Sequence, residues 1–274
     1  MAQRFLTGGI LLAMLIVVMY FGGAVLGTAA MICICFAVYE EFNALKIAGH
    51  RPVSWPTWVG MAGCIPLTLL TDGKAIVPLL VGVCLITLCC VIFREDPRLD
   101  DAMFCLLPMF TIALPGMCII SLAMVQPKAL QLTLLSLLFA APVAGDTFAF
   151  LVGSRVGGPK LCPAVSPKKT ISGAVAGLVG SMLIALVVGL VARTAVTDPA
   201  VLAHLPSYPA LALIGLLTGA AGQLGDLLAS MVKRHSGIKD FSNLFPGHGG
   251  MLDRLDSVLM SALVVYSFYL LGIM

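Results

Sequence analysis

Charged residues are scarce in this chain. Only 11% of its 274 residues are Asp, Glu, Lys or Arg, whereas 60% are hydrophobic. A soluble domain usually carries about a quarter charged residues, so lipid is the expected solvent for most of the chain. Long polar stretches, low-complexity tracts and obvious internal repeats are also absent from the sequence. These absences argue against a separate soluble domain and predict a single all-α, polytopic membrane unit.

Two common motifs are missing as well. The nine cysteines include no C-x-x-C pair, which leaves zinc or redox chemistry with little support and favours cysteine as a small packing residue. The order G-x-x-x-x-G-K-[ST] is absent, which excludes a Walker A phosphate-binding loop. The N-terminal apolar run continues to about Val38, far beyond the ~7–15 residues of a signal-peptide core. It therefore predicts a retained membrane helix.

Apolar segments of spanning length follow one another with short breaks. A transmembrane helix needs ~20 mostly apolar residues, and the sequence predicts about nine such helices, over 5–21, 23–39, 56–71, 75–93, 102–124, 130–152, 171–192, 209–231 and 256–273. The helices within 1–129 form an N-terminal group, and those within 130–274 form a C-terminal group with longer polar loops. Because only Gly22–Gly23 separates the first two, one long tilted helix is the alternative there.

The distribution of Lys and Arg predicts the orientation. With the N-terminus in the cytoplasm, all but three of the 16 basic residues fall in cytoplasmic segments, the exceptions being Lys74, Lys128 and Arg193. Positive charge is enriched in cytoplasmic loops of membrane proteins. We therefore expect a multi-pass protein of a bacterial-type inner (cell) membrane, with an odd number of spans and a basic cytoplasmic face that attracts phosphate groups.

The longest polar connection joins the last two predicted spans. It mixes glycines with acidic and basic residues, a composition suited to polyphosphate and metal, because carboxylates bind Mg²⁺, lysine and arginine bind phosphate and glycine allows close approach. Asp226, Ser230 and Lys233 share one helix face just before it, and an ionisable group inside an apolar span is a functional candidate by default. The residues that we single out in the loop are Arg234, Lys239, Asp240, His248, Gly249, Gly250, Asp253, Arg254 and Asp256.

Two of these residues have competing interpretations. Asp256 lies where the last span begins, so a role in catalysis and a role as a carboxylate cap of the helix N-terminus are both open. For His248, binding or structure is favoured over base catalysis, because phosphate is already ionised at neutral pH and needs little deprotonation to attack.

A second polar motif surrounds the sixth span. Asp146 lies well inside its apolar run, where a carboxylate is costly and therefore a functional candidate. The following loop carries hydroxyls and lysines just before the seventh span, where side chains and free backbone N–H groups can bind phosphate. Its candidate residues are Ser166, Lys168, Lys169 and Thr170.

These motifs together resemble the phosphatidate cytidylyltransferase (CDP-diacylglycerol synthase) family. The residues that match its signature are Ser230, Lys233-Arg234, Lys239-Asp240, Ser242, Pro246, His248-Gly249-Gly250, Asp253-Arg254 and Asp256, and the segments Gly145-Asp146-Thr147, Ser166-Pro167-Lys168-Lys169-Thr170 and Gly225-Asp226 are similar too. Two positions depart from the family pattern. Ile171-Ser172-Gly173 stands in place of Trp-Glu-Gly, and Ala229 stands where an acidic residue is common.

The resemblance implies a reaction and a set of roles. The reaction is transfer of a cytidylyl group from CTP to phosphatidate in the bilayer, giving CDP-diacylglycerol and pyrophosphate in phospholipid biosynthesis. Asp226 and Asp253 are implied to hold Mg²⁺, with a second cation such as K⁺, and for Asp253 this favours metal binding over helix capping. The implied catalytic residues are Asp226, Lys233, Arg234, Lys239, Asp240, His248, Asp253, Arg254 and Asp256. The implied substrate-binding residues are Asp146, Ser166, Lys168, Lys169, Thr170, Ser230, Gly249 and Gly250.

Partners and rival functions follow from the same residues. The family is reported as dimeric, so a homodimer is an expected partner, and no nucleic acid is expected. The nearest rivals are other lipid phosphotransferases, namely a polyprenol or phytol kinase or an enzyme that transfers CTP to an ether lipid, but the full signature argues against the kinases. An ion-coupled transporter with Asp146 and Asp226 on the ion path is a further alternative, although the repeated halves of many transporters are not visible here.

Overall fold

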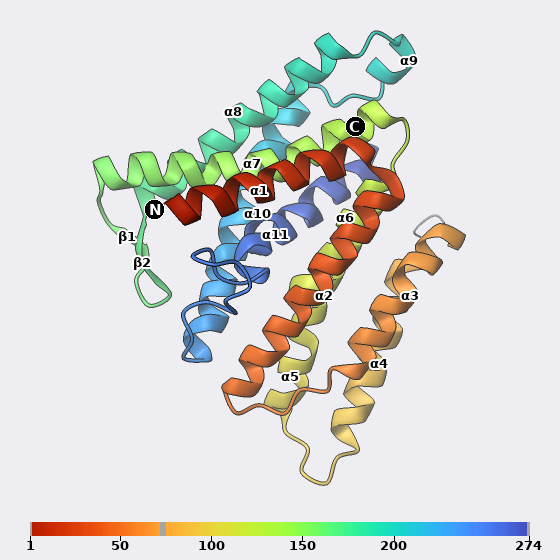
Figure 1. Cartoon of the computed structure of the whole chain (residues 1–274), viewed down its shortest axis with the longest axis vertical. Coiled ribbons are helices and arrows are strands. Elements are labelled where there is room, and N and C mark those ends of the chain that lie inside the picture. Colours follow the sequence, from red (N-terminus) through yellow and green to blue (C-terminus); the bar gives the residue numbers. More distant parts are fainter. Residues whose placement is uncertain (1, 72–74, 273–274) are drawn as a thin grey trace.

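The computed structural model describes residues 2–71 and 75–272, and these are mostly helical. The helices are α1 (Ala2–Phe21), α2 (Gly23–Ile47), α3 (Trp55–Thr71), α4 (Ile76–Ile92), α5 (Leu99–Pro108), the π-helical turn η1 (Met109–Ala113), α6 (Leu114–Ala123), α7 (Lys128–Val156), α8 (Ile171–Ala195), α9 (Pro199–Leu202), α10 (Tyr208–His235) and α11 (Leu252–Leu270) (Figure 1). The all-α prediction is confirmed with one addition. Strands β1 (Lys160–Cys162) and β2 (Ser166–Thr170) form an antiparallel hairpin between α7 and α8.

Each of the nine predicted spans coincides with a helix, but the number of spans is not confirmed. Among the described residues, five helices are long and apolar enough to cross a membrane: α2, α7, α8, α10 and the continuous rod Leu99–Ala123 that α5, η1 and α6 form together. Helices α3 and α4 have 17 residues each, and α11 carries three charged residues at its start. Lys74, predicted on the outer side, and residue 273, predicted in the last span, lie outside the described residues.

Residues 2–47 form two helices rather than one. The chain breaks at Gly22 and Gly23, whose φ angles of 59° and 51° lie in the left-handed region that favours glycine. A Cβ on Gly22 would also collide with the side chains of Lys128 and Gln131. The Lys128 ammonium donates hydrogen bonds to the carbonyls of Tyr20 (2.9 Å) and Phe21 (3.0 Å), which caps the end of α1. The break is therefore built into the packing of α1 against the start of α7.

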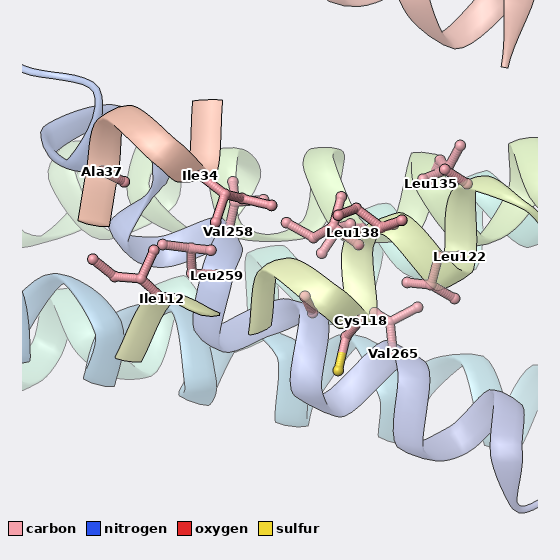
Figure 2. Packing of buried hydrophobic residues seen from close by; sticks show 14 of the residues in the cluster. Ile34, Ala37, Ile112, Cys118, Leu122, Leu135, Leu138, Val258, Leu259 and Val265 are labelled. Atoms are coloured by element: carbon pink, nitrogen blue, oxygen red, sulfur yellow. The ribbon is translucent and has the colours of Figure 1, made fainter. Parts of the chain in front are cut away.

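One hydrophobic core joins the N-terminal and C-terminal helices. Figure 2 shows side chains from α2, η1, α6, α7 and α11 meeting in it, among them Ile34, Ala37, Ile112, Cys118, Leu122, Leu135, Leu138, Val258, Leu259 and Val265. Helix α11 packs against α10 and α7 and also against α6 and α2. The helix that begins after the glycine-rich loop is thus held by both halves of the chain.

Small residues bring the C-terminal helices close together. Helix α7 packs most extensively against α8, and α10 packs against both α8 and α11. A Cβ on Gly145 would lie 2.5 Å from the Ser181 hydroxyl, and a Cβ on Gly225 would collide with the carbonyl oxygen of Asp256. Small residues at helix interfaces permit such close approach in membrane bundles. The contact at Gly225 places the end of α10 directly beside the first turns of α11.

Candidate active site

The connection between α10 and α11 folds back on itself beside the end of α10 (Figure 1). Gly237, Gly247 and Gly249 have φ angles of 67°, 77° and 81°, so each makes a turn that other residues rarely adopt. The Phe245 N–H donates to the Gly249 carbonyl oxygen at 2.9 Å, which closes the tip of the loop. The glycines thus shape the backbone that leads into α11.

Asp253 lies at the centre of this loop, in the first turn of α11. Its Oδ2 accepts hydrogen bonds from the backbone N–H groups of Phe241 and Gly250, both at 2.9 Å. Its Oδ1 pairs with the Lys233 ammonium at 2.6 Å, and the aspartate side chain is only 4% exposed. A Cβ on Gly249 would lie 2.7 Å from Oδ2. The carboxylate therefore ties the end of α10, the loop and the start of α11 together.

A second ion pair joins the β-hairpin to α10. The Lys169 ammonium contacts Oδ2 of Asp226, and both side chains are partly exposed. Asp146 on α7 lies within electrostatic range of Lys169 and Asp226, and Asp256 on α11 lies within range of Asp226 and Asp146. Asp226 is thus in contact with Lys169 and is electrostatically coupled to two further carboxylates, from α7 and α11.

Two candidate residues, Thr170 and His248, differ in their hydrogen bonding. Thr170 is buried and is the N-cap of α8, because its hydroxyl accepts the Gly173 N–H at 3.1 Å. Nδ1 of His248 is buried without a hydrogen-bond partner among the described residues. The substrate-binding role of Thr170 and the catalytic role of His248 stay predictions.

Other candidates face solvent or the surface of the bundle. Arg234, Lys239, Asp240, Arg254 and Lys168 are exposed, whereas Ser166 and Ser230 are partly buried. The exposed lysines and arginines among them are available to an anionic ligand, because these side chains bind phosphate well. The candidate residues thus comprise two lysine–carboxylate pairs and, in addition, exposed basic side chains.

Two acidic residues that the sequence analysis did not select also reach this region. Glu40 on α2 is 3% exposed and accepts hydrogen bonds from the hydroxyl of Ser242 (2.6 Å) and from the backbone N–H groups of Met251 (2.9 Å) and Leu252 (2.8 Å). The predicted span ended at residue 39, one position before Glu40, whereas α2 continues to Ile47. The default functional interpretation of a buried acid in a membrane helix would have identified it.

The neighbouring acid, Glu41, faces a different partner. Its Oε2 accepts a hydrogen bond from the Thr111 hydroxyl of η1 at 2.8 Å. Glu41, Thr111 and Asp256 line a cavity of about 20 Å³, together with apolar groups of α10 and α11. A cavity of this size has room for about one water molecule.

The carboxylates suit a cation, although the structure does not assemble a dedicated cage. Among the described residues, no three His, Cys, Asp or Glu side chains are grouped closely enough to hold a metal ion. Asp226 and Asp253 each pair with a different lysine. Mg²⁺ is usually bound by one or two carboxylates, with waters and substrate phosphates completing its shell. Carboxylates are therefore suitable donors for Mg²⁺, and its binding by Asp226 and Asp253 stays a prediction.

Fold and site together define a helical membrane protein with a charge-paired polar site where α7, α10, α11 and the β-hairpin meet. The chain belongs to the cytidylyltransferase family, whose model matches residues 2–271. This membership confirms the family resemblance seen in the signature residues.

Individual relatives carry a more specific name. The chain is 39% identical over 128 residues to a phosphatidate cytidylyltransferase of Bacillus subtilis, covering 47% of this chain and 43% of the relative. It is 39% identical over 139 residues to the enzyme of that name from Brucella melitensis, covering 50% and 46%, and 40% identical over 147 residues to that from Synechocystis, covering 53% and 45%. The alignments thus span less than half the length of these curated relatives.

Proposed function

We propose that this protein transfers a cytidylyl group from CTP to phosphatidate, giving CDP-diacylglycerol and pyrophosphate. The observation that carries the proposal is the pair of lysine–carboxylate contacts, Lys169 with Asp226 and Lys233 with Asp253, in a chain of the cytidylyltransferase family. The names of the relatives support phosphatidate as the acceptor. A site at the edge of an apolar bundle suits the meeting of a water-soluble nucleotide with a lipid whose tails stay in the bilayer.

In this reaction an oxygen of the phosphatidate phosphate attacks the α-phosphorus of CTP, and the bond from that phosphorus to the β-phosphate bridging oxygen breaks. Pyrophosphate leaves with the bonding electron pair. Because both substrates are strongly anionic, alignment and charge neutralisation are the main tasks of the protein. Lys168 and Lys169 on the hairpin, with Lys233, Arg234 and the other basic residues of the loop, can neutralise and orient the phosphates.

Mg²⁺ is the cofactor that we propose for this site, held by Asp226 and Asp253. When bound, such an ion polarises the phosphoryl oxygens and stabilises the departing pyrophosphate. The residues of the chain prepare the site for it, because Lys169 and Lys233 balance the two carboxylates and keep them ordered before substrate arrives. A second cation such as K⁺ and assembly as a homodimer are further parts of the proposal.

The proposed function can be tested by following where each radiolabelled phosphate of CTP goes. Purified protein is given phosphatidate and CTP labelled with ³²P at either the α or the γ position, with and without Mg²⁺. We expect the α label in the lipid product and the γ label in pyrophosphate, with turnover only when Mg²⁺ is present. Transfer of the γ label to a lipid would identify a kinase, and no turnover of CTP with any lipid would favour the transporter alternative.

We also propose that the N-terminus and the site lie in the cytoplasm, and several contacts support a one-sided arrangement. A Cβ on Gly8 of α1 would lie 3.7 Å from Nε2 of His248, so the start of α1 is beside the glycine-rich loop. Nε2 of His50, in the basic loop after α2, is 2.8 Å from Nε2 of His235 at the end of α10. Lys128, assigned to the outer side, instead contacts the far end of α1.

This orientation predicts the location of the C-terminus. Helix α11 begins at the loop, so its end should lie on the opposite side of the membrane. We expect a reporter that is active only outside the cytoplasm to be active when it is fused after Met274. The same reporter should be inactive when it is fused before Met1. Cytoplasmic activity of the Met274 fusion would contradict the proposed odd number of spans.

A further inference from the structure

The start of α11 is capped by a residue of a distant helix. The first N–H groups of a helix have no partner within it, and α11 has no side-chain cap at its N-cap residue Met251. The Glu40 carboxylate on α2 accepts the N–H groups of Met251 and Leu252. A negative charge at a helix N-terminus is favourable, and its hydrogen bonds are stronger than those between neutral groups. Glu40 therefore sets the position at which α11 begins.

Three consecutive backbone N–H groups are divided between two carboxylates. Asp253 accepts the N–H of Gly250, and Glu40 accepts those of the next two residues. Glu40 also accepts the hydroxyl hydrogen bond of Ser242, one residue after Phe241, whose N–H donates to Asp253. The two loop segments 241–242 and 250–252 are thus held by the same two acids, Glu40 from α2 and Asp253 from α11.

The contact also accounts for glycine at position 250. A Cβ on Gly250 would lie 2.5 and 2.6 Å from the two Glu40 carboxylate oxygens, and the backbone of Gly250 is not in the left-handed region. Neither a turn nor backbone strain requires glycine here. The requirement comes from direct docking of the loop backbone on the Glu40 carboxylate.

From these contacts we propose that Glu40 is a positioning residue of the site, which acts through the N-terminus of α11 to hold Asp253 and Asp256 in register with Asp226. The link to catalysis rests on the function proposed above, whereas the link to loop geometry does not. Partners that orient metal ligands from behind typically influence metal affinity or activity by about 10–100-fold. Glu40 has this relation to Asp253, since both carboxylates hold the same short segment.

The first test measures the order of the loop without any substrate. In detergent-purified protein, Glu40→Gln is expected to speed hydrogen–deuterium exchange in peptides covering 241–252 by about ten- to a hundredfold, as expected for the loss of charge-assisted hydrogen bonds. Glu41→Gln is the matched control, because Glu41 is the adjacent buried acid but bonds Thr111 instead of the loop. The proposal is overturned if exchange in these peptides is unchanged by Glu40→Gln, or if Glu41→Gln accelerates it equally.

A milder variant keeps the test decisive if Glu40→Gln does not fold. Ser242→Ala removes the hydroxyl donor to Glu40, together with the acceptor of the Leu244 N–H (3.2 Å), and leaves the buried carboxylate in place. The residues that report on Glu40 are therefore Met251 and Leu252, whose N–H groups it accepts. Faster exchange at these two residues is expected, by a smaller factor than for loss of the charge. Unchanged exchange in Ser242→Ala would then count against the proposal.

The second test asks whether Gly250 and Glu40 act as one unit. Gly250→Ala should disorder the loop in the wild-type background, because the added methyl group meets the Glu40 carboxylate. In a Glu40→Ala background the obstacle is absent, so the same substitution should have a much smaller additional effect on exchange. Independent, additive effects of the two substitutions would contradict the contact.

The third readout separates positioning from simple stability. We expect Glu40→Gln to raise the Mg²⁺ concentration for half-maximal turnover about tenfold or more, because a loosened Asp253 binds the ion less well. A purely structural role would reduce the amount of active enzyme and leave that concentration unchanged, and this outcome would refute positioning. If the wild-type protein forms no CDP-diacylglycerol, the proposed function fails, while the exchange results still decide the role of Glu40 in the loop.

Discussion

Replacement of Asp226 or Asp253 by asparagine should nearly abolish CDP-diacylglycerol formation while protein level and membrane insertion stay normal. Asparagine keeps the size and one oxygen ligand but removes the charge that a divalent cation needs. The loss of a preorganised electrostatic contact in an active site costs about 10²–10³-fold in kcat, and loss of the metal would cost more. The measurement is turnover of α-labelled CTP by the purified variants over a range of Mg²⁺ concentrations.

The two aspartates differ in their structural neighbours, and this difference sharpens the experiment. Asp253 holds the loop through two backbone N–H groups, so its variant needs the hydrogen-exchange measurement as a control for loop order. Asp226 makes no such backbone contact among the described residues and pairs with Lys169. Asp100→Asn, at an exposed carboxylate at the start of α5, is the control for charge removal elsewhere. The metal assignment fails if either site variant keeps most of its activity with unchanged Mg²⁺ dependence.

The helices could be predicted from the sequence because a helix depends mainly on the residues within its own segment. Each long apolar run forms a helix. The glycine pair at 22–23 separates α1 from α2, so the two-helix alternative holds and the single long helix does not. The number of membrane crossings did not follow in the same way, since α3 and α4 are short and α11 starts with charged residues. Whether a helix crosses the membrane depends on the length of its apolar part, and about 20 residues are needed. A difference of a few residues at a helix end is enough to change the answer.

The site was predictable only in part, because some of its contacts join distant segments. Asp146, Lys169 and Asp226 were all candidates from the sequence alone. Lys169 and Asp226 are in contact in the structure, and Asp146 lies within electrostatic range of both. Glu40 contacts residues more than 200 positions away, and no periodicity within either segment indicates that contact. The contact of Gly250 with Glu40 was not predictable from the sequence either. From the sequence, Gly250 was interpreted as a position that lets a substrate approach, and in the structure it packs against the Glu40 carboxylate.

The second large effect is expected at Lys169. Its ammonium contacts Asp226 and lies within range of Asp146, whereas the adjacent Lys168 is exposed. Lys169→Ala removes a contact to phosphate and also leaves the carboxylates near one another without their cation. Since a hydrogen bond to a charged group is worth about 1.5–3 kcal/mol, we expect kcat/KM to fall about ten- to a hundredfold. Lys168→Ala should weaken phosphate handling as well, mainly through a higher KM for CTP.

Comparison of three hairpin lysines separates substrate contact from membrane topology. Lys160→Ala is the matched control, because Lys160 lies on β1 of the same hairpin and is exposed. An exposed lysine adds little stability, so the Lys160 and Lys168 variants should fold like the wild type. Lys169 is partly exposed and paired with Asp226, so its alanine variant is compared with Lys169→Arg, which restores the charge and should recover part of the activity. Wild-type kcat/KM in both Lys168→Ala and Lys169→Ala would mean that the hairpin serves only the cytoplasmic excess of positive charge. A large loss in Lys169→Ala alone would instead locate the catalytic contribution in the ion pair with Asp226, since Lys168 and Lys160 contribute the same charge to the same face.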